Sequence, residues 1–259
     1  MKKPDKQKRS PLKRKPLRNP GESLQLERAW LFDEELLPSL LFATVFVLFA
    51  VHEWMQVFFN LVPSPRTISV VAMIAVGYCT FRFIALRKRS DRLRLGLEGE
   101  KAVGQFLEDL RRTGCRVFHD IVGDGFNIDH VVVSPRGIFV IETKTYSKSN
   151  RGRGVVEFDG ERILVNGFEP ERNAVRQVRA LATWLRDLLA ESTGRRFPIR
   201  CAVVFPGWFV ENHTKRPSDV WVLNPKGLPT FIHREPVQLK PEDVALVSSR
   251  IIAHMQSVA

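Results

Sequence analysis

Two long uncharged stretches near the start of this chain restrict its fold more than any other feature. Leu36–Val51 (LLPSLLFATVFVLFAV) carries no charge, and a second apolar run, WMQVFFNLV, follows after two polar residues. Ile68–Phe81 is uncharged again, and its apolar character extends to Leu86. Each stretch approaches the roughly 20 residues that cross the hydrocarbon core of a bilayer. Residues 36–86 are therefore predicted to form two transmembrane helices joined by a Pro-Ser-Pro turn.

Two other interpretations of these stretches are a pair of buried helices in a soluble protein and a signal peptide. The apolar region of a signal peptide begins close to the N-terminus, whereas this one starts after about 35 residues. Arg82, near the end of the second stretch, can extend its charged group to the membrane interface. Trp54 suits the opposite interface. A transmembrane hairpin is thus the preferred interpretation, with the end of its first helix left open around His52 and Glu53.

Positive charge is concentrated outside the apolar stretches. The net charge is +12, and residues 1–19 hold nine Lys or Arg and one acidic residue, so this segment contributes +8 and the other 240 residues about +4. The high isoelectric point is therefore weak support for a nucleic-acid partner. The segment 1–19 is predicted to be a disordered, solvated tail, with contact to anionic lipid or nucleic acid as the alternative. Residues 1–35 together are assigned as this tail and a juxtamembrane segment.

The flanks of the two stretches predict an orientation. The loop between them contains Arg66 as its one basic residue, whereas five Lys or Arg residues lie within 87–96. Because basic residues stay on the cytoplasmic side, both termini and the following domain are predicted to be cytoplasmic. The protein is thus expected to be an integral membrane protein.

The three cysteines exclude two classes of small fold. Cys79, Cys115 and Cys201 are odd in number, far apart, and without a CxxC neighbour. A disulfide scaffold and a structural zinc site are therefore not expected, and a reducing compartment fits this cysteine usage.

Residues 97–259, after a charged linker at 87–96, have the pattern of a mixed α/β domain. Apolar residues at helical spacing alternate with short β-branched runs bounded by Gly, Pro and Asp. The predicted helices cover 97–110, 172–190 and 242–255, and the predicted strands cover 117–122, 127–134, 137–145, 155–158, 162–165, 199–205 and 220–223.

One constellation in this domain points to chemistry. Glu142 and Lys144 end an apolar strand and share one face of it, since alternate residues of a strand point the same way. Asp129 lies on the hairpin partner, at the end that a turn at 135–137 brings near Glu142. Two carboxylates and an ammonium group suit metal-assisted hydrolysis of a phosphodiester, with Mg²⁺ held by oxygen ligands. A surface hairpin with an ordinary salt bridge is the alternative, because the ExK spacing alone is weakly specific.

The surrounding sequence strengthens the first interpretation. The segments LGLEGEKAV, HD before a loop, IDHVVVSPRGIFVIETKTY and NAVRQVRAL occur in this order between about residues 95 and 185. This combination resembles the NERD (nuclease-related) domain, a branch of the PD-(D/E)xK nuclease superfamily. The resemblance implies a restriction-endonuclease-like mixed sheet flanked by helices.

The resemblance also implies roles for individual residues. Asp129 and Glu142 match the two metal-binding carboxylates, and Glu100 matches an acidic residue that ligates the metal directly or through water. Lys144 matches the catalytic lysine, and Gln177 matches the polar residue that borders such sites. The implied cofactor is Mg²⁺ or Mn²⁺.

The chain departs from the family pattern at two places, which bear on the loop after the ExK strand and on the details of the substrate. The later helix begins with Asn173-Ala174, where the family often has Asn-Pro. After the ExK strand the chain has Tyr146 and then SKSNRGRG, where the family often has a Trp or a Gly pair. The acidic residues themselves are intact.

Neighbouring residues have less specific interpretations. His130 should face away from Asp129, as a core or supporting histidine or alternatively as a ligand or base. Asp120, beside His119 at the end of the neighbouring strand, is interpreted as a turn residue. A basic loop is assigned either to solvent or to phosphate contact in nucleic-acid binding; its residues are Lys148, Arg151 and Arg153.

These observations together predict a membrane-anchored, Mg²⁺-dependent nuclease, acting on DNA in preference to RNA. A catalytically inactive module that binds nucleic acid or protein at the membrane is the first alternative, and a membrane scaffold is the second. The sequence holds no P-loop, GxSxG or HExxH motif that would indicate another enzyme class.

Overall fold

A computed structural model describes residues 17–59, 65–148, 154–215 and 217–258. The chain divides into two compact units, one of Gly21–Glu98 and one of Met1–Pro20 together with Gly99–Ala259. Most of the predicted basic tail, and the lipid contact assigned to it, lies outside the described residues.

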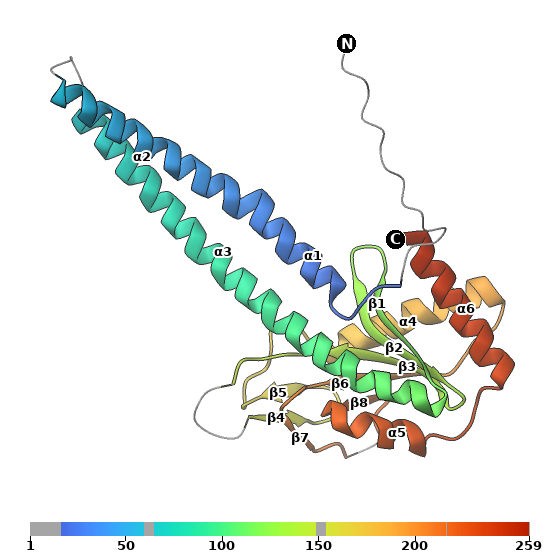
Figure 1. The fold of residues 1–259 in the computed structure, drawn as a ribbon. Coiled ribbons are helices and arrows are strands. Elements are labelled where there is room, and N and C mark those ends of the chain that lie inside the picture. Colours follow the sequence, from blue (N-terminus) through green and yellow to red (C-terminus); the bar gives the residue numbers. More distant parts are fainter. Residues whose placement is uncertain (1–16, 60–64, 149–153, 216, 259) are drawn as a thin grey trace, which may run out of the picture. The chain divides into compact units, whose positions relative to one another are not determined.

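The first unit is helical. It contains α1 (Glu22–Trp30), a π-helical turn η1 (Leu31–Leu36), α2 (Leu37–Phe58) and the longer part of α3 (Pro65–Glu108). Figure 1 shows α2 and α3 running side by side. Both helices are long and apolar enough to cross a membrane by length and composition.

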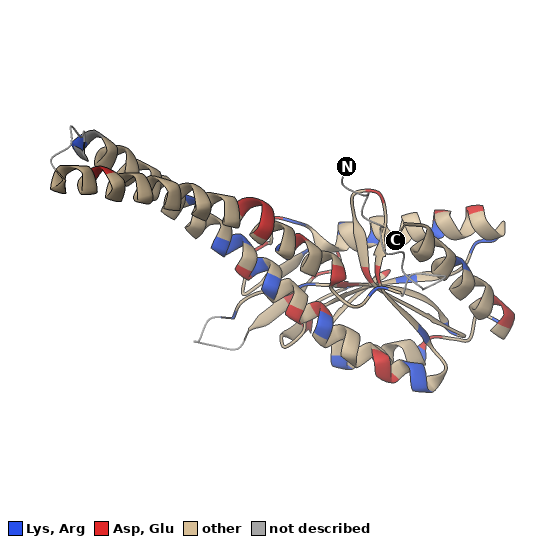
Figure 2. Ribbon diagram, turned by 45° about the horizontal axis from the view of Figure 1, so that its top comes forward, with Lys and Arg blue, Asp and Glu red and all other residues tan. Residues whose placement is uncertain are grey.

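Contacts along the hairpin establish that α2 and α3 pack in antiparallel fashion. Near one end, the Trp54 indole N–H donates to Ser69 Oγ at 3.2 Å. Nearer the other end, the Cys79 thiol donates to the carbonyl of Ser39 at 3.2 Å. The buried residues of α3 between these ends are small, which lets the two backbones approach closely. Figure 2 shows that most of the hairpin carries no charged residues.

Charged residues join the helices where the apolar stretches end. Arg82 pairs with Glu35 at 3.4 Å, and Arg89 pairs with Glu27 at 2.8 Å and with Glu35 at 3.7 Å. The predicted linker at 87–96 is helical and continuous with α3, because its Leu, Arg and Lys residues are strong helix formers.

The second unit is built on a five-stranded mixed sheet of order β1-β2-β3-β6-β8. The first three strands pair antiparallel and the last three parallel. Their bounds are β1 Arg116–Val122, β2 Asn127–Ser134, β3 Gly137–Thr143, β6 Ile199–Val204 and β8 Val220–Leu223. A smaller sheet of order β5-β4-β7 contains β4 Val155–Phe158, β5 Ile163–Val165 and β7 Phe209–Asn212.

Helices cover both faces of the larger sheet (Figure 1). The helices α4 (Ala174–Thr193) and α6 (Pro241–Val258) pack on one face. The end of α3 and α5 (Leu228–Arg234) pack on the other, accompanied by the short 3-10 helices η2 (Asp109–Thr113) and η3 (Pro225–Gly227). This arrangement confirms the predicted mixed sheet flanked by helices. Every residue of β3 is buried, so this strand is covered on both of its faces.

The sequence did not predict α1 or η1, which make part of the segment 1–35, assigned to a tail and juxtamembrane segment, helical. In the α/β unit it missed η2 and η3, and also β7 and α5. The four residues of β7 (FVEN) are too few for a clear alternation, and α5 (LPTFIHR) contains a proline in its first turn. Asp120 is not a turn residue, because it lies within β1 with a left-handed φ of 50°. Its carboxylate is held by Arg18 at 2.9 Å and by the Asn127 side-chain amide at 2.9 Å, which joins the segment before α1 to the α/β unit.

Candidate active site

Glu142 is the last but one residue of β3, the central strand of the sheet. The hairpin turn and the parallel pairing with β6 fix its position, since Glu142 lies opposite Val203. Its side chain lies on the same face as Val140 and α4, and only 3% of the residue is exposed. A buried carboxylate at the end of an apolar strand is costly unless partners hold it.

Two polar side chains provide those partners. Lys144 Nζ donates to Glu142 Oε1 at 2.7 Å, and the Gln177 side-chain amide donates to the same oxygen at 2.7 Å. Lys144 Nζ also donates to Gln177 Oε1 at 2.9 Å, which closes a triangle of hydrogen bonds. The second oxygen, Glu142 Oε2, is buried and has no hydrogen-bond partner among the described residues. The structure thus brings together three of the predicted site residues and leaves one oxygen of Glu142 available.

Asp129 completes the acidic part of the cluster. The β2–β3 register, in which His130 faces Ile141, continues to place Asp129 opposite Glu142. Asp129 Oδ2 accepts the backbone N–H of Thr143 at 2.7 Å. Burial raises the pKa of Asp129 well above its usual range, and repulsion from Glu142 and Glu100 adds to this rise. Burial also raises the pKa of Glu142, although Lys144 and Gln177 oppose that shift.

Glu100 approaches the cluster from α3, and it is 6% exposed. The residue before it explains this close approach. A Cβ at Gly99 would lie 2.1 Å from Thr145 Cγ2, so glycine is required for α3 to pass this close to the end of β3. The LGLEGEKAV segment therefore has a steric reason for its second glycine, which sets the distance between Glu100 and the strand.

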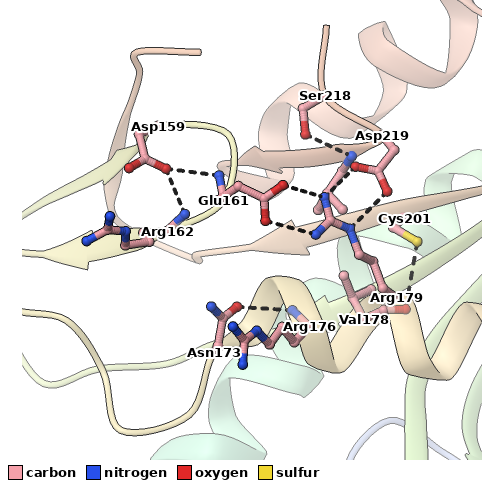
Figure 3. Close-up of polar contacts among 11 residues, drawn as sticks. Asp159, Glu161, Arg162, Asn173, Arg176, Val178, Arg179, Cys201, Ser218 and Asp219 are labelled. Atoms are coloured by element: carbon pink, nitrogen blue, oxygen red, sulfur yellow. Dashed lines mark hydrogen bonds and ion pairs between the residues drawn. The ribbon is translucent and has the colours of Figure 1, made fainter. Parts of the chain in front are cut away.

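The position of Gln177 depends on how α4 is anchored (Figure 3). Asn173 caps the helix by accepting the backbone N–H of Arg176 at 3.0 Å. Arg179 donates to both oxygens of Asp219 at 2.7 and 2.9 Å, and to Glu161 at 3.2 and 3.4 Å. The Arg179 guanidinium lowers the pKa of Asp219. One arginine thus joins the first turns of α4 to the β4–β5 turn and to the start of β8.

A pair of buried histidines was not recognised from the sequence. His119 Nδ1 and His130 Nδ1 lie 2.8 Å apart, and His119 Nε2 lies 3.0 Å from Glu108 Oε1. Burial lowers the pKa of both rings, most strongly that of His130. His130 is thus a core histidine whose ring contacts His119, and the opposed HD and DH dipeptides of the β1–β2 hairpin are the sequence signal for this pair.

The donor set fits a hard divalent cation in part. No three His, Cys, Asp or Glu side chains of the described residues converge closely enough to hold a metal ion as they stand. The fit rests instead on two facing carboxylates, Asp129 and Glu142, and on the buried Glu142 Oε2, which no described residue hydrogen-bonds. Oxygen ligands of this kind suit Mg²⁺, which retains several water molecules and needs few protein ligands.

The predicted nucleic-acid residues are described only in part. The Lys148 ammonium group lies 5.4 Å from the centre of the Trp208 ring and donates to the carbonyl of Gly207. Arg151 and Arg153 lie outside the described residues.

Comparison with known proteins assigns part of the chain to a family. Residues 95–206 match the family profile of the nuclease-related domain, NERD, which belongs to the PD-(D/E)xK-like nuclease group. This segment is a NERD domain. It contains Glu100, Asp129, Glu142, Lys144 and Gln177, and its end coincides with the loop that follows β6.

Two individual proteins are also similar to parts of the chain. An uncharacterized protein of Bacillus anthracis is 39% identical over 56 residues, and the match covers 20% of this chain and 26% of that protein. The chain thus spans about a quarter of the length of this relative. The structure of Pyrococcus furiosus SfsA in complex with Ca²⁺ is 15% identical, covering 61% of this chain and 53% of that one, with a TM-score of 0.26. At that TM-score it bears on neither fold nor function.

Proposed function

We propose that this chain is a membrane-anchored nuclease that hydrolyses phosphodiester bonds of nucleic acid, DNA in preference to RNA, with Mg²⁺ or Mn²⁺ as cofactor. The observation that carries the proposal is the Glu142–Lys144–Gln177 triangle facing Asp129. Lone buried charges are rarely retained for stability, and perturbed carboxylates beside a lysine are typical of reactive sites. The NERD domain supports nuclease chemistry in general.

The residues would divide the work as follows. Asp129 and Glu142, with Glu100 directly or through water, would hold the cation, which neutralises the phosphate and lowers the pKa of a bound water. Lys144 orients the attacking water or stabilises charge that develops on the phosphate oxygens. Gln177 fixes Lys144 and Glu142 relative to one another through its two hydrogen bonds. Lys148 and the arginines at 151 and 153 would contact the nucleic-acid backbone.

The test is a cleavage assay of the full chain in detergent. Single- and double-stranded DNA and RNA of one sequence are incubated with Mg²⁺, Mn²⁺ or a chelator. Cleavage should require the divalent ion, and Lys144→Ala or Glu142→Gln should reduce its rate by about 100-fold or more. Lys240→Ala, which removes an exposed lysine outside the site, should leave the rate unchanged.

Two outcomes would count against the proposal. Cleavage that survives both substitutions would separate the activity from this site. Calorimetric binding of a divalent ion and of DNA without any cleavage would instead favour the inactive binding module.

A further inference from the structure

The helical unit contains a cavity of about 550 Å³ between the α1–η1 segment and α3. Its apolar lining includes Leu31 and Leu36 from η1 and Phe83 and Leu86 from α3. This volume lies within the range of pockets that hold small organic ligands. The π-helical turn contributes four of the lining residues, and π-helical turns, which are rare, frequently occur at functional sites.

Two arginines line this cavity without a carboxylate partner. Nearby, Arg82 and Arg89 are both in ion pairs with Glu27 or Glu35. By contrast, Arg28 and Arg87 form no ion pair with any carboxylate in the described part of the chain. Arg28 Nε donates to Ser90 Oγ at 3.3 Å. The cavity therefore combines an apolar interior with two guanidinium groups that form no ion pair among the described residues, and with one carboxylate, that of Asp33.

The cavity has a defined position relative to the apolar stretches. It is lined by residues between Gln25 and Leu36 and between Phe83 and Leu97, at the charged ends of the two candidate membrane spans. If the hairpin spans a bilayer, these residues lie at the level of the lipid headgroups. Basic pockets between helices at this level bind phosphate-bearing headgroups.

We propose that this cavity binds one bilayer phospholipid, a site that rests on the membrane anchoring proposed above. Its phosphate would contact Arg28 and Arg87, whose planar guanidinium groups match phosphate oxygens. One acyl chain would lie against Leu36 and Phe83. Asp33 also lines the cavity, so a headgroup that carries an ammonium group would gain a further contact.

The experiment measures lipid retained by the full chain. The protein is reconstituted into vesicles of phosphatidylcholine alone or mixed with phosphatidylglycerol or phosphatidylethanolamine, re-extracted in mild detergent, and analysed by native mass spectrometry and phosphorus assay. Wild-type protein should retain about one phospholipid per chain. The double variant Arg28→Gln/Arg87→Gln should retain at least tenfold less, since two charge-assisted contacts are lost. The matched control is Arg94→Gln, because Arg94 is exposed and paired with Glu98 on the same helix.

A second variant tests the apolar part. Ala29 lines the cavity, and Ala29→Phe should reduce retention by filling the space without removing a charge. Equal retention by wild type and by both variants in all three lipid mixtures would overturn the proposal. Carbonate extraction of the same membranes separates this failure from a failure of anchoring, because an unanchored chain would be released into the supernatant.

Discussion

Asp129 lies in a buried position that disfavours its negatively charged form. It is 6% exposed, faces Glu142 across the hairpin, and is repelled by Glu100 as well. The backbone N–H of Thr143 donates a hydrogen bond to the Asp129 carboxylate at 2.7 Å. We therefore expect Asp129 to lower the stability of the metal-free fold, since destabilising residues are tolerated where function depends on them.

Asp129→Asn should therefore stabilise the metal-free protein and abolish cleavage. Asparagine keeps an oxygen that accepts from Thr143 N–H but removes the repulsion from the two neighbouring carboxylates. We expect the unfolding free energy in the presence of a chelator to rise by about 0.5–2 kcal/mol. Thermal unfolding followed by tryptophan fluorescence gives the comparison, and Asp124→Asn in an exposed loop is the matched control. Destabilisation by Asp129→Asn would show that the carboxylate serves the fold.

Packing between a helix and a strand determines the width of the site. The C-terminal part of α3 and the end of β3 approach so closely at Gly99 and Thr145 that no Cβ fits between them. Glu100 follows Gly99 and Lys144 precedes Thr145. The distance between these two site residues therefore depends on this close packing. Substitution of the other glycine of LGLEGEKAV should be tolerated better. A Cβ at Gly96 would meet only the end of the flexible Leu24 side chain, at 3.1 Å.

Gly99→Ala should separate these two elements. Because the neighbouring atoms belong to a β-branched side chain, we expect a loss of about 1–3 kcal/mol in unfolding free energy and a marked loss of cleavage. Thr145→Ala removes the two atoms closest to the new Cβ. In the double variant it should therefore restore most of the unfolding free energy and most of the cleavage. Urea denaturation and cleavage of all three variants test this coupling, and additive effects in the double variant would contradict it.

The whole chain is asymmetric in charge along its length. Basic residues precede the first apolar stretch and follow the second, whereas Arg66 is the one basic residue in the connecting segment. Large apolar side chains such as Phe58, Met73 and Phe81 are more than two-thirds exposed in the helical unit, as lipid-facing residues would be. These features underlie the proposed orientation, in which both termini and the NERD domain are cytoplasmic.

Cysteine labelling should reveal this topology. Ser257→Cys, near the end of α6, should react with a membrane-impermeant maleimide from the cytoplasmic side of oriented vesicles, and Arg66→Cys from the opposite side. The three native cysteines give a low background because all are buried. Labelling of both positions from the same side would exclude a spanning hairpin.

Much of the α/β unit could be predicted because its signals are local. The β2 strand has the predicted bounds, and Pro135-Arg136-Gly137 forms the predicted turn, since a short apolar run and a turn motif determine them within a few residues. The ExK spacing likewise placed Glu142 and Lys144 on one face of a strand. Short β7 and Pro-containing α5 escaped prediction because tertiary contacts, rather than local pattern, stabilise them.

The sequence by itself determined two apolar helices, a mixed α/β domain, and the similarity of residues 95–206 to the NERD family. Only the tertiary structure decided that Asp120 lies inside a strand, that His119 and His130 pair in the core, and that Gln177 joins Glu142 and Lys144. The reason is physical. The periodicity that identifies a helix or strand is a property of residues close together in the sequence. Contacts between side chains 11 or 35 residues apart depend instead on how the elements pack.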